Sequence, residues 1–276
     1  MKSIGFVDYY LNEWHANNYV GWIRETSEKL GYDFDVKYAW AELDCDPKGE
    51  MSSDEWCNKY KVTKCASIDE ISEKSDYIII LAPSNPETHL RYAESVLKYE
   101  KNTYIDKTFA PDFDTARKIF DIAEKYDTKF FSSSALRYAS ELDEAKGALT
   151  FATVGCGSNF EEYIIHQAEM LIKILGCDVS GVHSEARSDG IFAIDVKFDS
   201  GKSGAMLFDP KSSYAISAML PSGTSVEKRI DSKLIFVSLI KDILRFFNDG
   251  TVSFNLNETL SVIKLRELAI KSVKNL

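Results

Sequence analysis

Three ionisable side chains stand where they could act on a small molecule. Glu162 and His166 lie four residues apart in a segment with helical apolar spacing, so both face the same side of the predicted helix. Lys107 directly follows a short predicted strand, 102–106. A histidine can serve as a general base, and a lysine can stabilise a developing oxyanion. Taken alone, a solvated lysine at a strand end and a histidine packed within a helix are the simpler interpretations.

The cysteines favour neither a metal centre nor a disulfide framework. The five are Cys45, Cys57, Cys65, Cys156 and Cys177, an odd number without a C-x-x-C pair. The spacing of Cys57 and Cys65 matches no zinc pattern. We therefore expect free thiols, as is usual in the cytoplasm, and no metal.

The elements that must position these side chains alternate between strands and helices in the first half. Predicted strands cover 3–8, 35–43, 62–66, 76–82, 102–106 and 129–132, and predicted helices cover 16–30, 86–99 and 112–125. The run DYIIILA at 76–82 is apolar, as expected of a strand buried on both faces. Such strand–helix–strand units predict a Rossmann-like doubly wound parallel sheet, which binds ligands at the carboxyl ends of its strands. The corresponding loops follow Val7, Leu43, Ala82 and Ile105.

The second half has a different rhythm. Predicted strands cover 149–154, 181–186, 190–198, 203–208, 214–220 and 225–230, and predicted helices cover 139–148, 161–175, 233–247 and 256–273. Short successive strands flanked by helices predict an α+β domain with a mainly antiparallel open sheet. We expect a Rossmann-like domain over 1–134 and a substrate and oligomerisation domain over 135–276.

Between Asp76 and Leu142 the sequence resembles the Gfo/Idh/MocA family, the relatives of glucose–fructose oxidoreductase and inositol dehydrogenase. The family's proline-containing loop and following histidine correspond to APSNPETH at 82–89. Its Glu-Lys-Pro element corresponds to Asp106-Lys107-Thr108, and its Arg-Phe or Arg-Tyr pair to Arg137-Tyr138. The resemblance extends to an inward-facing helix that carries an acid, a histidine and a second acid. These correspond to Glu162, His166 and Glu169.

The resemblance implies hydride transfer between NAD or NADP and a sugar, cyclitol or polyol-like substrate. His166 would be the general base, Lys107 its electrostatic partner, and Glu162 a residue near the substrate hydroxyls. The implied cofactor-binding residues are Asp8, Tyr10, Asp44, Pro83, Ser84 and His89. Among these, Asp44, or Asp46 close by, follows the second strand, where an acid would bind the adenosine ribose and favour NAD.

The first turn departs from the family pattern. The glycine positions of G-x-G-x-x-G hold Asp8, Tyr10 and Glu13, whose side chains would obstruct a diphosphate and whose two carboxylates would repel it. This puts the binding of either dinucleotide in doubt. Thr108 replaces the proline after Lys107, so we expect a trans peptide bond there.

Composition excludes several classes of function. A formal net charge of −10 argues against a nucleic-acid binder. The sequence shows neither an apolar run long enough to span a membrane nor a secretory signal, so we expect a cytoplasmic protein. The alternative to an oxidoreductase is a non-catalytic ligand- or partner-binding relative that has lost dinucleotide binding. Alternating apolar residues in 191–196 also predict a homo-oligomer formed through the C-terminal sheet.

Overall fold

The computed structural model describes residues 1–188 and 190–276 and divides into two compact units. The first contains Met1–Ser132 and Leu239–Ser253, and the second contains Ser133–Ser238 and Phe254–Leu276. The structure thus differs from the expected division in that residues 239–253 return to the first unit. The reason is aromatic packing, since the Phe247 ring stacks on Tyr77 with centroids 4.8 Å apart and also contacts Phe34.

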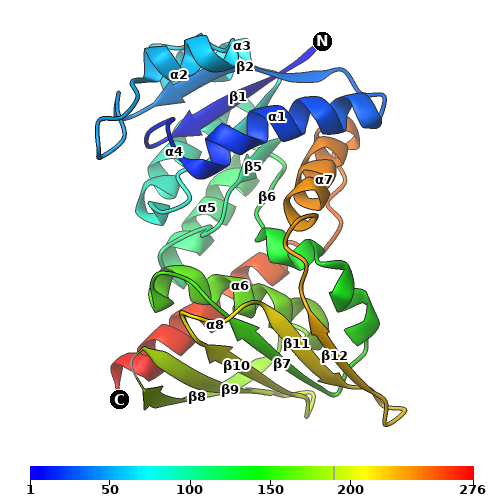
Figure 1. Ribbon diagram of the computed structural model, residues 1–276. Helices are drawn as coiled ribbons and strands as arrows, with labels where there is room; N and C mark the ends of the chain where they lie inside the picture. The colour runs from blue at the N-terminus through cyan, green and yellow to red at the C-terminus, as the bar shows by residue number, and fades with distance from the viewer. Residues whose placement is uncertain (189) are drawn as a thin grey trace. The chain divides into compact units, whose positions relative to one another are not determined.

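The first unit is built on a parallel sheet with the strand order β3-β2-β1-β4-β5-β6 (Figure 1). The strands are β1 (Lys2–Asp8), β2 (Phe34–Ala41), β3 (Thr63–Lys64), β4 (Tyr77–Ile80), β5 (Thr103–Ile105) and β6 (Phe130–Phe131). This order confirms the doubly wound fold, and it places the change of winding direction between β1 and β4. Ligand sites in such sheets lie at the carboxyl ends of the strands beside that point.

Helices connect these strands. They are α1 (Trp14–Lys29), α2 (Ser53–Tyr60), α3 (Ile68–Lys74), α4 (His89–Val96) and α5 (Phe113–Lys125). The sequence did not predict α2, which begins with a reciprocal capping box between Ser52 and Glu55. The predicted helix over 86–99 is divided, because 3-10 turns at Pro86–Thr88 and Leu97–Tyr99 flank α4.

The second unit has a mixed sheet with the order β12-β11-β7-β10-β9-β8 (Figure 1). Its strands are β7 (Thr150–Gly155), β8 (Val179–Ser188), β9 (Ile191–Phe198), β10 (Ser203–Phe208), β11 (Ala215–Met219) and β12 (Ser225–Arg229). Among the described strands of this second sheet, only β7 and β10 pair in parallel. This confirms the prediction of a mainly antiparallel sheet.

Helices cover one face of this second sheet. Helices α6 (Phe160–Leu175) and α8 (Asn257–Lys274) lie together there, and α7 (Ile235–Asp249) begins in this unit and continues into the first. Gly204 of β10 permits the close approach of α6, because a Cβ atom at this position would lie 2.7 Å from Leu171 Cδ2. The helix predicted over 139–148 is instead a pair of 3-10 segments, Ala135–Tyr138 and Ser140–Ala145.

Along the described chain, no helix is long and apolar enough to cross a membrane. The same residues contain no group of three His, Cys, Asp or Glu side chains that could hold a metal ion. All five cysteines are free thiols.

Candidate active site

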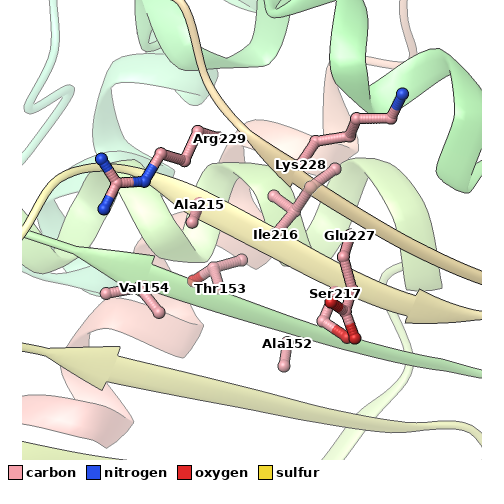
Figure 2. A pocket seen from close by; sticks show the side chains of 9 residues that line it. All are labelled: Ala152, Thr153, Val154, Ala215, Ile216, Ser217, Glu227, Lys228 and Arg229. Carbon is pink, nitrogen blue, oxygen red and sulfur yellow. The ribbon is translucent and has the colours of Figure 1, made fainter.

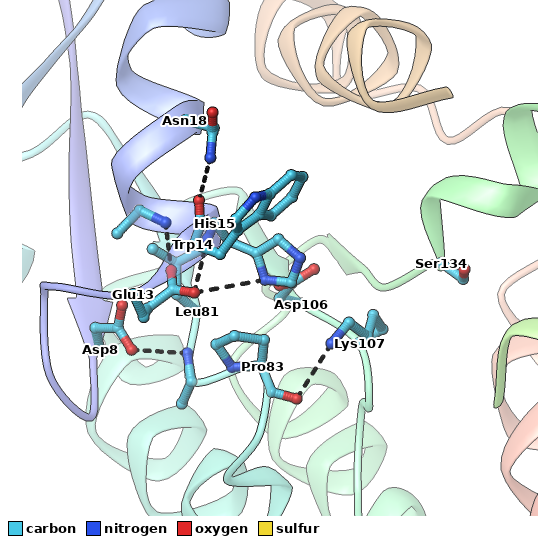
Figure 3. A network of polar contacts seen from close by, with 12 residues as sticks. Asp8, Glu13, Trp14, His15, Asn18, Leu81, Pro83, Asp106, Lys107 and Ser134 are labelled. Carbon is cyan, nitrogen blue, oxygen red and sulfur yellow. Dashed lines mark hydrogen bonds and ion pairs between the residues drawn. The ribbon is translucent and has the colours of Figure 1, made fainter. Parts of the chain in front are cut away.

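Asp8 ends β1 and is buried between the turns that follow β1 and β4. Its Oδ1 accepts hydrogen bonds from Tyr9 N at 2.7 Å and from Ala82 N at 2.9 Å, the second of which is drawn in Figure 3. Its Oδ2 has no hydrogen-bond partner among the described residues. Burial, together with the nearby Glu13 carboxylate, holds the pKa of Asp8 well above its usual range. Asp8 therefore serves to join the two turns, and its protonated form is the favoured one.

Glu13 is the N-cap of α1. Its carboxylate accepts hydrogen bonds from His15 N at 2.7 Å and from Ala16 N, the free amides at the start of the helix (Figure 3). The side chain is only 8% exposed. Burial raises the pKa of Glu13, while the charge of His15 and these two amides act in the opposite direction. The chain itself thus supplies an anion at the helix N-terminus.

His15 links the start of α1 to the end of β5. Its Nδ1 lies 3.0 Å from Asp106 Oδ2 and 3.8 Å from a Glu13 oxygen. Asp106 is fully buried, and its Oδ1 accepts a hydrogen bond from Tyr104 Oη at 3.0 Å. Burial alone would raise the pKa of Asp106, but His15 and Lys107 hold it below the usual range. The His15 imidazole therefore contacts a buried acidic cluster, defined here as Asp8, Glu13 and Asp106.

Residues implied by the resemblance to contact the adenosine end have other partners. The exposed Asp44 makes an ion pair with Lys64 at 2.9 Å. Asp46 is buried and accepts a hydrogen bond from Asn12 Nδ2 at 3.1 Å, which lowers the pKa of Asp46 and ties the second loop to the first turn. Tyr10 is half-buried beside Tyr9, with ring centroids 6.1 Å apart.

Lys107 and Pro83 meet at the carboxyl ends of β5 and β4. Lys107 Nζ donates a hydrogen bond to Pro83 O at 3.4 Å (Figure 3). The neighbouring Ser84 is exposed. The peptide bond between Lys107 and Thr108 is cis, so the expected trans bond is wrong.

His89 fixes the loop between β4 and α4. The side chain is fully buried, with Nε2 2.6 Å from Leu81 O and Nδ1 3.1 Å from Phe109 O. Burial lowers the pKa of His89, although both carbonyl groups oppose this. Because both ring nitrogens face main-chain carbonyls, His89 shapes the loop that carries Pro83.

In the second unit His166 is held by Ser134. Ser134 Oγ lies 2.7 Å from His166 Nδ1 and accepts a hydrogen bond from Leu136 N at 3.2 Å. The His166 ring also packs edge-on against Tyr214, with centroids 5.9 Å apart. Nothing in the sequence pattern had singled out Ser134.

Two acids of α6 have separate tasks. Glu162 stands in its first turn, where its carboxylate accepts a hydrogen bond from Asn159 Nδ2 at 2.9 Å. Glu169 is buried and pairs with Arg137, which also reaches Glu258 at 2.6 Å. Arg137 is therefore part of a buried ion network that joins the start of the unit to α6 and α8. Lys107 belongs to the first unit, and Glu162 and His166 belong to the second.

Residues 45–134 match the model of GFO_IDH_MocA, described as "Oxidoreductase family, NAD-binding Rossmann fold". This match confirms the family resemblance seen in the sequence. It covers the β4 strand, the Pro83 loop and Lys107. No curated protein matches the chain.

Solved structures of dehydrogenases share the fold along the whole chain. Scyllo-inositol dehydrogenase from Lactobacillus casei, solved with bound NAD(H) and scyllo-inositol, aligns with a TM-score of 0.81 at 11% identity over 100% of this chain and 98% of that one. A probable dehydrogenase from Thermotoga maritima aligns with a TM-score of 0.80 at 13% identity over 99% and 97%. UDP-N-acetylglucosamine 3-dehydrogenase from Acidithiobacillus ferrooxidans aligns with a TM-score of 0.77 at 10% identity over 99% of this chain and 98% of that one.

A dinucleotide bound in the usual way would place its diphosphate against the amides that open α1. Here Glu13 already occupies the His15 and Ala16 amides, and the buried Asp106 carboxylate adds negative charge nearby. The first turn in this arrangement does not fit a diphosphate. The side chain that occupies the N-terminus of α1 is Glu13. The sequence had indicated Tyr10 equally as a residue that would obstruct the diphosphate.

Proposed function

We propose that this chain is an NAD(P)-dependent oxidoreductase of the Gfo/Idh/MocA type, which transfers a hydride to or from a sugar, cyclitol or related polyol. The observation that carries the proposal is the position of Lys107, in the segment that matches the family. Its ammonium group lies at the carboxyl ends of β4 and β5, beside Pro83. The family's enzymes use this part of the sheet for chemistry, and the resemblance implies the same here.

The roles of the side chains follow from their chemistry. His166 exchanges a proton with the substrate hydroxyl, and Ser134 orients its ring through Nδ1. Lys107 stabilises negative charge that develops on a substrate oxygen at the carboxyl ends of β4 and β5. Glu162, four residues before His166 on α6, accepts hydrogen bonds from neighbouring hydroxyls. Pro83 and Ser84 border the reacting centre, and His89 holds their loop in place.

Turnover of polyols tests the proposal. Purified protein is incubated with NAD or NADP and a panel of inositols, aldoses and nucleotide sugars, while the absorbance of reduced nicotinamide is followed. We expect turnover of at least one, and a loss of about 100-fold or more in Lys107→Ala and His166→Ala. Glu162→Gln should mainly raise KM. No turnover with any substrate in either direction, together with no binding of NADH or NADPH at millimolar concentration, would favour the non-catalytic alternative.

We also propose that the protein is a homo-oligomer in which the open face of the second sheet contacts a second copy. A shallow groove of about 380 Å³ lies on β7, β11 and β12, lined by Ala152, Val154 and Ala215 and bordered by Glu227 and Arg229 (Figure 2). Leu207 on the adjacent strand β10 is 37% exposed, and Met219 at the end of β11 is 41% exposed. An apolar centre with a polar border is typical of an interface. A strictly monomeric mass by light scattering would contradict this.

A cytoplasmic location is part of the same proposal. Five free thiols are typical of a reducing compartment, and burial raises the pKa of Cys57 and of Cys65 to about 11, so both remain unreactive. Imaging of a tagged chain together with a compartment marker tests this placement.

A further inference from the structure

We propose that Glu13 is an internal competitor for the dinucleotide diphosphate, so that a dinucleotide binds the first unit only when this carboxylate has left the amides of α1. The inference rests on the proposed function, since it concerns the same cofactor. The inference goes beyond the proposed function because it names Glu13 as the residue that limits the affinity for the cofactor.

The contacts of Glu13 are those that a bound phosphate would make. Two consecutive amides, of His15 and Ala16, donate to its two carboxylate oxygens at the positive end of a 16-residue helix. The main chain supports this position, because Glu13 N donates to Leu11 O at 2.8 Å and Glu13 O accepts from Asn17 N at 3.0 Å. One anion can use these amides at a time, so phosphate and carboxylate exclude each other.

The surroundings of Glu13 make a second anion unfavourable. Asp8 and Asp106 are at most 1% exposed, and Asp8 Oδ2 has no hydrogen-bond partner among the described residues. The imidazole of His15 is shared between Asp106 and Glu13, at 3.0 and 3.8 Å. A diphosphate added to this cluster would find the His15 imidazole already engaged by two carboxyl groups. Departure of Glu13 frees both amides and removes one of these two contacts of His15.

Substitution at this single position can separate charge from shape. Glu13→Gly removes the competing group and leaves a residue that is acceptable as an N-cap, so α1 should still form. Glu13→Gln keeps the length of the side chain and one acceptor oxygen but removes the charge. Glu25→Gln is the matched control, because it makes the same change in net charge on the exposed side of α1, where Glu25 pairs with Lys29.

Calorimetric titration with three probes tests the inference. NADH and NADPH report on the whole site, and inorganic pyrophosphate reports on the amides without requiring a nicotinamide site. We expect Glu13→Gly to bind NADH or NADPH, and pyrophosphate, about tenfold or more tightly than the natural chain, with Glu13→Gln intermediate and Glu25→Gln unchanged. Circular dichroism of each variant verifies that the helices remain.

The outcomes separate this inference from the proposed function. Equal affinity of the natural chain and Glu13→Gly for all probes would overturn the inference but leave the oxidoreductase proposal intact. No binding of any probe by folded Glu13→Gly would also overturn it, because freeing the amides would not have opened a site. Tighter pyrophosphate binding without turnover of any polyol would support the inference and count against the proposed function.

Discussion

Ser134 Oγ lies 2.7 Å from Nδ1 of His166, although the two residues are 32 positions apart in the chain. Ser134 is fully buried and is itself held by Leu136 N, whose N–H it accepts at 3.2 Å. A hydroxyl that has one fixed donor can still donate to, or accept from, an imidazole nitrogen. Ser134 therefore fixes the ring of His166 in both of its protonation states.

This relationship predicts a catalytic effect of Ser134→Ala. We expect kcat for polyol oxidation to fall about tenfold with little change in KM, and the pH–rate profile to shift, because His166 loses the partner that sets its orientation. Ser133→Ala is the control, since it also removes a buried hydroxyl, one that donates to Ser134 O, without touching His166. If Ser134→Ala and Ser133→Ala both lower the amount of folded protein but leave kcat per folded molecule unchanged, Ser134 has only a structural role.

The buried carboxyl of Asp8 predicts a pH-dependent stability. Burial and Glu13 raise its pKa, so folding favours the protonated form, and the contribution of Asp8 to stability is lost as pH rises through the folded-state pKa. Asp8→Asn should therefore raise the free energy of unfolding by about 1 kcal/mol near pH 8, with the gain disappearing toward pH 4. Guanidinium unfolding at both pH values measures this. Asp121→Asn on exposed α5 should show no such dependence.

Periodicity and strand ends were sufficient to predict the fold. The apolar run at 76–82 contains the central strand β4, and Lys107 does follow a buried strand, as the pattern required. Helix α2 was missed because only three of its residues, Ser53, Trp56 and Cys57, are buried, which leaves a weak apolar signal. The capping box at Ser52 and Glu55 was the available signal.

The chemistry of the first turn depended on details that spacing does not contain. The sequence predicted a helix from residue 16, whereas α1 begins at Trp14, and this shift of two residues makes Glu13 its N-cap. The charge of Glu13 at a glycine position therefore predicted repulsion of a phosphate. It did not predict that the Glu13 carboxylate would itself bind the amides that a phosphate would use. Ser134 could not be found either, since its link to His166 arises only when the start of the second unit packs on α6.

The buried ion network of the second unit predicts a large cost for removing one partner. Arg137 is 4% exposed, contacts Glu169 and Glu258, and lies 3.9 Å above the Phe254 ring. Arg137→Ala should lower the free energy of unfolding by about 3 kcal/mol, because Glu169 is left buried without its cation. Lys228→Ala, which breaks an exposed ion pair with Glu144, should cost less than about 1 kcal/mol. Equal effects of the two substitutions in denaturant unfolding would contradict this account.

His89 gives the first unit an opposite response to acid. Burial lowers its pKa, so the folded chain favours the neutral ring; stability is complete above the unfolded-state pKa of about 6.5 and is lost as pH falls below it. His89→Gln should be less stable near pH 8 by about 1–3 kcal/mol, because the contacts with Leu81 O and Phe109 O are weakened. It should also lose less of its remaining stability between about pH 7 and pH 5. His183→Gln is the control, because the His183 side chain is 73% exposed on β8. Thermal unfolding of the natural chain, His89→Gln and His183→Gln is measured across this pH range. Parallel pH profiles for all three would contradict the role given to His89.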